Sequence, residues 1–151
     1  MVRLVLDTNV LVNADRGEGS HGKRILDLVR WGEVEAVISD PVKREKQLIV
    51  GRLVKDRALQ EGVKDYFSKA RMVEPVEVMV PIEDEEDMKL VELAVGGQAQ
   101  YLITDDRHLL DLGQVGTCRI LKPAEFWQWW QTQQDGNGST WASWAKQTLG
   151  Q

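Results

Sequence analysis

Several residue types and sequence features are scarce in this chain, and their scarcity excludes whole classes of protein. The 151 residues include a single cysteine, Cys118, so the chain has neither an internal disulfide nor a zinc site built from several thiolates. No long apolar run opens the sequence, because Asp7 interrupts it after six residues, too early for a signal-peptide core or a membrane span. We therefore expect a cytoplasmic protein with no membrane segment.

The overall composition is that of an ordinary globular protein. Hydrophobic residues make up 42% of the sequence and charged residues 28%, which gives no support to a disordered or fibrous chain. A chain of this length fits one domain and can bury roughly two thirds of its unfolded surface. Residues 135–139 (DGNGS) resemble a flexible linker. We predict one folded domain over residues 1–132 and a flexible, tryptophan-containing C-terminal tail over residues 133–151.

Charge is unevenly distributed along the sequence. The net charge of −5 and the pI of about 5.1 oppose tight nonspecific binding to nucleic acid, because such binding depends on Lys and Arg that displace counterions. Residues 43–71 nevertheless contain nine basic and four acidic residues, a net charge of +5, while the remainder carries −10. This basic segment is the part of the chain best suited to contact phosphates.

Hydrophobic patterns predict strands that alternate with helices. Apolar runs predict strands over residues 34–39, 100–104 and 119–121, and residues 3–6 and 10–12 together have the composition of a buried strand. One further short strand is predicted, either near Met72 or over residues 76–80. Apolar spacing, with Pro and Gly at element ends, predicts helices around residues 25–29, 41–54, 59–69, 83–94, 109–112 and from Pro123 onward. This alternation implies an α/β fold with a parallel sheet, whose ligands collect at the C-terminal ends of the strands.

Three acidic positions suggest a shared site. Asp7 (in LVLDTNVLV) and Asp106 (in YLITDDRHLLDL) each follow a predicted buried strand, and Asp87 lies at a helix start in the acidic run 83–87. Each has a simpler interpretation when taken alone. Asp7 and Asp106 could be helix caps or turn formers, and the acidic run could be a solvated helix face whose carboxylates suit the helix dipole.

The combination of these three carboxylates favours a metal site. Brought together without compensating bases, they would repel one another and destabilise the fold unless a divalent cation neutralised them. Oxygen ligands select hard cations, so Mg²⁺ or Mn²⁺ is favoured over Zn²⁺, in agreement with the lack of His or Cys pairs at ligand spacing. Hydrolysis of a phosphodiester through a metal-activated water is the chemistry that such clusters most often serve.

The motifs that carry these acids resemble a known family. LVLDTNVLV, DEEDMKLVELAVGGQAQYLITDDRHLL and the closing ILKPAEF look like one subgroup of the PIN-domain ribonucleases, which include the toxins of bacterial and archaeal toxin–antitoxin pairs. The resemblance runs from Val2 to about Phe126. It implies a PIN-like three-layer α/β/α sandwich around a central, mainly parallel sheet, so that residues 1–132 would be a PIN-like nuclease domain.

The resemblance also implies roles for particular residues. The family uses four acids that bind metal and activate water, and by motif the first, third and fourth are Asp7, Asp87 and Asp106. We expect these three to be catalytic acids and metal ligands. Asn9 and Thr104 correspond to supporting polar groups.

The second family acid and one extra carboxylate are less clearly matched. In the family, the second acid lies on the helix after the second strand, a few residues past a serine. Glu45, which follows Ser39, fits best as this catalytic acid, and Asp40 is the competitor. A surface salt bridge with its basic sequence neighbours is an equally good interpretation of Glu45. Asp105 stands where the subgroup commonly has glycine, so its carboxylate either joins the site as a supporting group or caps a turn.

The function implied by the resemblance is metal-dependent endoribonuclease activity, with Mg²⁺ or Mn²⁺ as cofactor, in the toxin of a toxin–antitoxin pair. RNA and an antitoxin protein are the expected partners. Arg52, Lys55 and Arg57 are the expected nucleic-acid contacts, although these bases could equally form a solvated helix face. The competing function is a catalytically silent PIN-fold module that binds RNA or protein. A haloacid-dehalogenase phosphatase fits less well, because it needs a second Asp where this chain has Asn9.

Tryptophan is abundant near the C-terminus. The sequence has six tryptophans, and we expect that Trp127, Trp129 and Trp130 cannot all point into one core. Tryptophan is enriched at the centres of protein interfaces. We therefore expect the region from Trp127 to Trp144 to contact another chain, and the protein to form a homo-oligomer.

Overall fold

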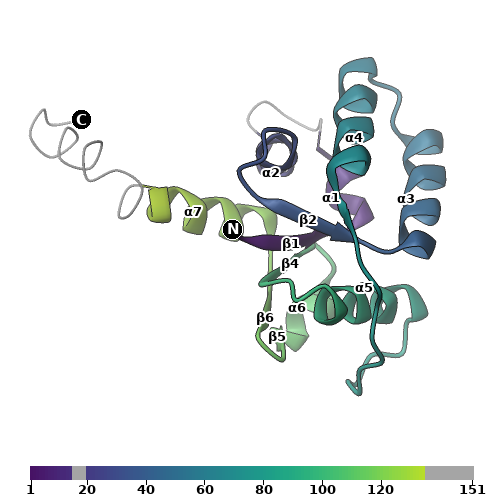
Figure 1. Ribbon diagram of the computed structural model, residues 1–151, viewed down its shortest axis with the longest axis vertical. Coiled ribbons are helices and arrows are strands. Elements are labelled where there is room, and N and C mark those ends of the chain that lie inside the picture. Colours follow the sequence, from purple (N-terminus) through teal and green to yellow (C-terminus); the bar gives the residue numbers. More distant parts are fainter. Residues whose placement is uncertain (15–19, 135–151) are drawn as a thin grey trace, which may run out of the picture.

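Strands and helices alternate along most of the chain in the computed structural model, which describes residues 1–14 and 20–134 (Figure 1). The strands are β1 (Arg3–Leu6), β2 (Glu35–Ile38), β3 (Arg71–Met72), β4 (Tyr101–Ile103), β5 (Gln114–Val115) and β6 (Cys118–Leu121). The helices are α1 (Thr8–Val12), α2 (His21–Arg30), α3 (Asp40–Leu53), α4 (Arg57–Lys69), α5 (Glu85–Gly96), α6 (Arg107–Leu112) and α7 (Pro123–Gln133). The predicted α/β fold class is confirmed.

The strands of the described residues form one sheet in the order β3-β2-β1-β4-β6-β5. Neighbouring strands are parallel except for β5 and β6, which form an antiparallel pair at one edge. The central strand is β1, where Leu4 lies opposite Ala36 of β2 and Tyr101 of β4. Parallel neighbours end at the same edge of a sheet, so the segments that follow β1 and β4 meet there.

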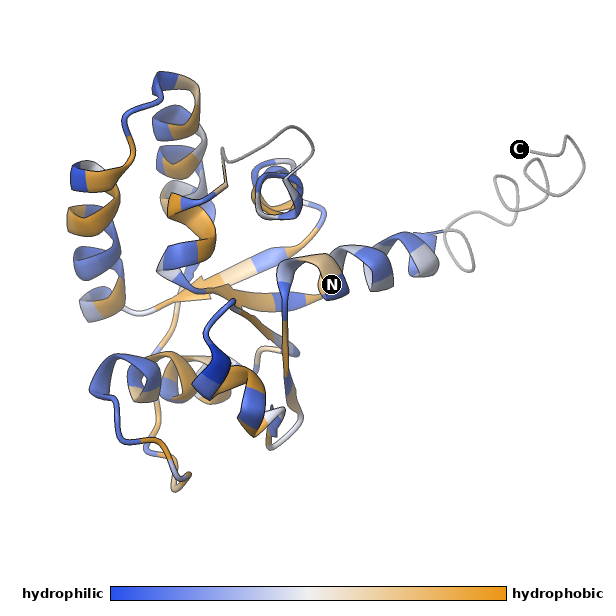
Figure 2. Cartoon of the chain, turned by 180° about the vertical axis from the view of Figure 1, so that it is seen from behind, coloured by the Kyte–Doolittle hydropathy of each residue, from blue (hydrophilic) through white to orange (hydrophobic). Residues whose placement is uncertain are grey.

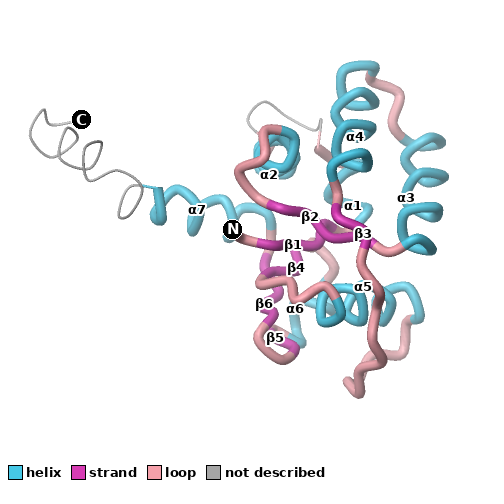
Figure 3. Tube along the Cα trace, viewed as in Figure 1, coloured by secondary structure: helices cyan, strands magenta, loops and turns pink. Residues whose placement is uncertain are grey.

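Helices cover both faces of the sheet, as the three-layer sandwich requires. In Figures 1 and 3, α2, α3 and α4 lie above the strands, and α5 and α6 lie below them. Figure 2 shows that hydrophobic residues gather on the strands and on parts of the helices around them. No helix in the described part of the chain is long and apolar enough to cross a membrane.

The centre of the sheet is buried from both sides. Leu4, Val5 and Leu6 of β1 and Ile103 of β4 are all 0% exposed, and Leu102 is 1% exposed. This double burial explains why these strands read as short continuous apolar runs in the sequence rather than as alternating patterns. It also means that a polar residue placed directly after β1 or β4 enters apolar surroundings.

Two segments predicted as strands are not strands. Residues 10–12 belong to α1, which starts immediately after β1, because the Asp7 carbonyl accepts hydrogen bonds from the amides of Val10 and Leu11. Residues 76–80 lie in an irregular connection between β3 and α5. The short strand predicted either there or near Met72 is found at Met72, as β3. Apolar content alone does not distinguish a short buried helix from a strand.

The tryptophans of α7 are all partly buried against the core, so the expectation that they cannot face one core was wrong. The Trp129 ring lies 4.8 Å from the Tyr101 ring, measured between centroids. Trp127 lies under the Arg24 guanidinium at 5.5 Å. Successive sides of α7 reach different neighbours, because the helix packs against α2 and its Phe126 and Trp129 rings lie against Tyr101 of β4. The expected linker and tail beyond residue 134 lie outside the described residues.

Candidate functional site

Asp7 lies directly after the central strand β1 and is 8% exposed. Its backbone amide donates a 2.9 Å hydrogen bond to the Ile103 carbonyl, which continues the pairing of β1 with β4. Its side chain makes no capping hydrogen bond to α1. Instead, Oδ2 accepts a 2.7 Å hydrogen bond from the Thr104 hydroxyl. The simple helix cap that the sequence allowed is therefore not the role of this carboxylate.

Thr104 connects Asp7 to Asp106. The Thr104 residue is 0% exposed, and its hydroxyl oxygen, which donates to Asp7, also accepts a 2.9 Å hydrogen bond from the Asp106 amide. Asp106 does cap α6, because its Oδ1 accepts a 2.7 Å hydrogen bond from the His108 amide. This cap uses one of the two carboxylate oxygens and holds the side chain at the end of β4.

Asp87 approaches from the other side of the site, in the first turn of α5, and is 9% exposed. The N-terminus of this helix is capped by Asp84, whose Oδ1 accepts hydrogen bonds of 2.9 and 3.0 Å from the amides of Glu86 and Asp87. Burial, followed by the negative charges of Asp106, Asp84 and Asp7, raises the pKa of Asp87 to about 6. These carboxylates are thus close enough to repel one another.

One cavity of about 260 Å³ collects the predicted acids. Its wall includes Asp7, Asp87, Asp106 and Glu45, together with Asn9. A wider hollow of about 730 Å³ adjoins it and shares three of its acids, Asp84, Asp87 and Asp106. These three shared acids therefore lie where the smaller cavity meets the wider hollow.

The donor chemistry of this cavity fits a hard divalent cation. All of the candidate ligands are carboxylates, which Mg²⁺ and Mn²⁺ prefer, and the raised pKa of Asp87 reflects a repulsion that a cation would relieve. Within residues 1–14 and 20–134, however, no three Asp, Glu, His or Cys side chains lie in an arrangement that could hold a metal ion as they stand. The right groups face one cavity, and their side chains are not preset in ligating positions.

Glu45 faces the same cavity from α3, and Asp40 does not border it. The Lys89 Nζ donates a 2.8 Å hydrogen bond to Glu45 Oε1 and also contacts Glu86 at 3.3 Å. The hydrogen bond from Lys89 lowers the pKa of Glu45, whereas the hydrogen bond with Glu45 raises the pKa of Glu86. The cationic partner of Glu45 is therefore a lysine of α5 rather than one of its basic neighbours in sequence.

Lys46 is a cation at this site that sequence analysis missed. It is 1% exposed, it borders the cavity, and its Nζ donates a hydrogen bond to the Leu6 carbonyl. Burial lowers the pKa of Lys46 to about 8, while the charge of Asp7 opposes that shift. The signal that could have revealed it is the buried stripe of α3, in which Val42, Lys46 and Val50 recur every four residues.

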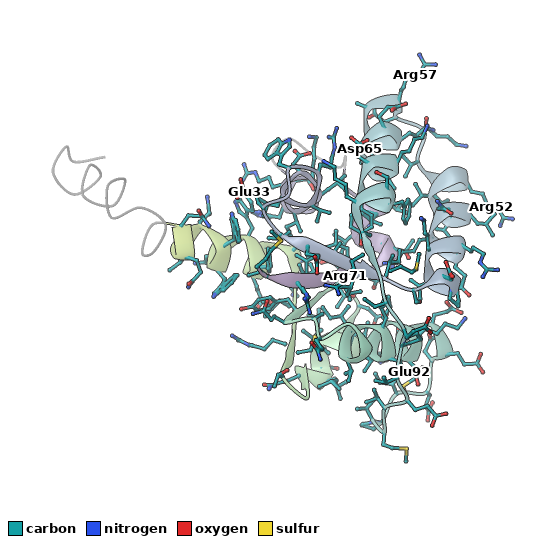
Figure 4. The ribbon with its side chains drawn as sticks, viewed as in Figure 1. Glu33, Arg52, Arg57, Asp65, Arg71 and Glu92 are labelled. Atoms are coloured by element: carbon teal, nitrogen blue, oxygen red, sulfur yellow. The ribbon has the colours of Figure 1, made fainter. Side chains whose placement is uncertain are left out.

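Of the remaining predicted site residues, some border the acid cavity and others lie away from it. Asn9 is exposed and borders the cavity. Asp105 is exposed and borders a separate hollow of about 310 Å³ near the start of α2. Arg52, Lys55 and Arg57 are exposed around the connection between α3 and α4. Figure 4 shows Arg52 and Arg57 pointing outward from that end of the molecule.

Comparisons with known proteins place the fold. A family model described as a PIN domain matches residues 3–108, which is more than half of the chain. No curated protein matches the chain at a significant level. Among solved structures, this chain superposes with a TM-score of 0.51 on a chain of VapBC2 from Rickettsia felis. That structure is of VapBC2 bound to a DNA fragment from its promoter. The two chains are 16% identical, with 79% of this chain and 97% of that chain covered, a likeness that concerns the fold alone.

Proposed function

Because this chain belongs to the PIN-domain family, whose members are generally nucleases, we propose that it is a metal-dependent endoribonuclease that hydrolyses RNA phosphodiester bonds. One observation carries the proposal. Asp7, Asp87 and Asp106 come from three separate segments and border a single cavity, where burial and charge repulsion raise the pKa of Asp87. Clustered carboxylates of this kind destabilise a fold unless a cation neutralises them.

We assign a Mg²⁺ or Mn²⁺ ion to Asp7, Asp87 and Asp106. Such an ion lowers the pKa of a water molecule and offsets charge on the leaving oxygen of a phosphodiester. The Thr104 hydroxyl holds Oδ2 of Asp7, which keeps that carboxylate at the end of β1. Glu45 is the fourth acid in this proposal: it borders the same cavity, where the hydrogen bond from Lys89 holds its carboxylate and lowers its pKa.

The substrate path in this proposal follows the basic segment. Arg52 lies seven residues beyond Glu45 on α3, roughly 10 Å along the helix axis. Together with Lys55 and Arg57 it would hold the phosphates of an RNA strand whose scissile bond lies over the acids. The wider hollow gives the strand room, and His108 borders that hollow next to Asp106.

We further propose that the chain is the toxin of a toxin–antitoxin pair and acts in the cytoplasm. The fold likeness to a chain of the VapBC2 complex supports this assignment. Leu48 and Leu53 of α3 are 63% and 59% exposed, which suits a surface that an antitoxin or a second copy of the chain covers. In this proposal residues 1–132 are the nuclease domain, and the region from Trp127 to Trp144 contacts another chain.

A catalytically silent module that binds RNA or protein is the competing function. The observation in its favour is that, in the described residues, no three metal-binding side chains are already arranged around a metal position. Incubation of purified protein with labelled RNA separates the two functions. We expect internal cleavage in Mn²⁺ or Mg²⁺ and none in excess EDTA. RNA that binds but stays intact in every divalent ion would favour the silent module.

A further inference from the structure

A buried lysine sits at the end of the central strand. Lys46 comes from α3, is 1% exposed, and its Nζ donates a hydrogen bond to the carbonyl of Leu6. The register of β1 with β2 ends at Leu4 and Ala36, so the Leu6 carbonyl lies beyond that ladder and takes the lysine as its donor. The ammonium group is thereby fixed next to the backbone from which Asp7 projects.

Several acidic groups border the same cavity as this ammonium, and the charge of Asp7 acts on it. The carboxylates that border this cavity come from the ends of β1 and β4, from α3, and from the start of α5, and they are Asp7, Glu45, Asp84, Glu86, Asp87 and Asp106. Lys89 is the second lysine of the cavity wall, and its side chain is 39% exposed and paired with Glu45 and Glu86. Solvent screens a half-exposed lysine of this kind, whereas the charge of Lys46 acts inside the fold.

We propose that the ammonium of Lys46 is a fixed internal counter-charge of the carboxylate cavity, which offsets Asp7 in the metal-free protein and weakens the binding of a divalent cation there. This inference rests on the proposed metal site. A buried charge is retained in a fold only when opposite charges and hydrogen bonds compensate it. Here Asp7 and the Leu6 carbonyl provide that compensation. The positive charge of Lys46 therefore offsets part of the attraction between the carboxylates and an entering cation.

Replacement of Lys46 by a neutral residue of similar length tests the proposal. Isothermal titration of Mn²⁺ into metal-free full-length protein gives the affinity of the native chain and of Lys46→Met. We expect the variant to bind Mn²⁺ at least about tenfold more tightly, a change of about 1.4 kcal/mol. Lys46→Gln keeps a donor for the Leu6 carbonyl without the charge, and we expect the same direction. Circular dichroism and thermal melting establish that each variant is folded.

Lys43→Met is the matched control. Lys43 lies on the same helix one turn earlier, but it borders a groove between α3 and α4 rather than the acid cavity. The substitution removes the same charge from a partly exposed position, and screening should limit its effect on Mn²⁺ affinity to about twofold or less.

The outcomes separate this inference from the proposed function. Tighter Mn²⁺ binding by the Lys46 variants, with little change in Lys43→Met, supports the counter-charge. Equal or weaker binding by both folded Lys46 variants, while the native chain binds Mn²⁺, overturns it and leaves the metal site intact. A lack of Mn²⁺ binding by the native chain and by both Lys46 variants overturns the metal site and this inference together. Binding by the Lys46 variants alone would support the counter-charge and contradict metal use by the native chain.

Discussion

The Thr104 hydroxyl donates a 2.7 Å hydrogen bond to Oδ2 of Asp7, across 97 residues of sequence. Both groups are buried, and the same hydroxyl oxygen accepts the Asp106 amide. A single side chain therefore holds the ends of β1 and β4 in a fixed relation at the carboxyl edge of the sheet. The bridge thus links the Asp7 carboxylate to the backbone of Asp106, and both acids border one cavity.

Replacement of Thr104 by valine removes the bridge while keeping the shape of the side chain. The buried Asp7 carboxylate and the Asp106 amide each lose a partner, so we expect the free energy of unfolding to fall by about 1–3 kcal/mol. RNA cleavage should fall about 10- to 100-fold because Asp7 is no longer oriented. Urea denaturation and single-turnover cleavage measure the two effects. Thr104→Ser keeps the hydroxyl and should retain most of both properties; equal losses in the two variants would assign Thr104 a packing role only.

The pH dependence of stability should reveal Asp87. Its pKa is raised from 3.8 to about 6 in the fold, so the folded state binds the proton more tightly than the unfolded chain. Stability from this group is therefore fully present below about pH 4 and is lost as the pH rises through about 6. In EDTA, Asp87→Asn should gain stability relative to the native chain between about pH 4 and pH 7, by about 1–3 kcal/mol.

Denaturant titrations at the two pH values measure this difference. The exposed residue Glu33 lies away from the acid cavity, so Glu33→Gln should differ from the native chain by the same amount at both. If the gap between Asp87→Asn and the native chain were independent of pH, Asp87 would not be held in a repulsive, desolvated position.

Salt dependence tests the basic segment. Replacement of Arg52, Lys55 and Arg57 by Ala should weaken RNA binding and flatten its salt dependence, whereas bases outside residues 43–71 should matter little. Each lost phosphate contact should reduce the slope of log affinity against log salt by roughly 0.7 for a single strand. Lys23 and Arg119 are exposed and lie outside the segment, so their replacement by Ala is the control. An unchanged slope in the triple variant would show that the strand reaches the acids by another route.

Much of the fold follows from local patterns in the sequence. The strands at residues 3–6 and 101–103 are short apolar runs that only a sheet covered on both faces buries completely. The helix that starts at Pro123 was predicted because proline suits the first helical turn. The short helix α1 was missed because VLV has a strand-like composition, and only the hydrogen bonds to the Asp7 carbonyl show that the chain turns there.

The site was harder to predict from sequence patterns than the sheet was. Acids at strand ends pointed to Asp7 and Asp106, and their bridge through Thr104 needed the register of β1 with β4. The partner of Glu45 could not be predicted, because Lys89 lies 44 residues away and meets it only through the packing of α3 near α5. Lys46 looked like one more base in the basic segment, although its position on the buried stripe of α3 sets it apart.

Divalent-dependent cleavage of RNA by carboxylate variants tests the central claim most directly. We expect Asp7→Asn and Asp106→Asn each to lower Mn²⁺- or Mg²⁺-dependent cleavage by at least about a hundredfold, since each removes a ligand charge. Both variants should stay folded, and in EDTA the melting temperature of Asp106→Asn should equal or exceed that of the native chain because repulsion is relieved. Asp7→Asn relieves repulsion too, but it also removes the charge that compensates the buried Lys46, so its melting temperature should be lower than that of Asp106→Asn. Glu33→Gln, the exposed control, should cleave like the native chain. Native-like cleavage by either folded aspartate variant would contradict the assignment of this cavity as a metal-dependent nuclease site.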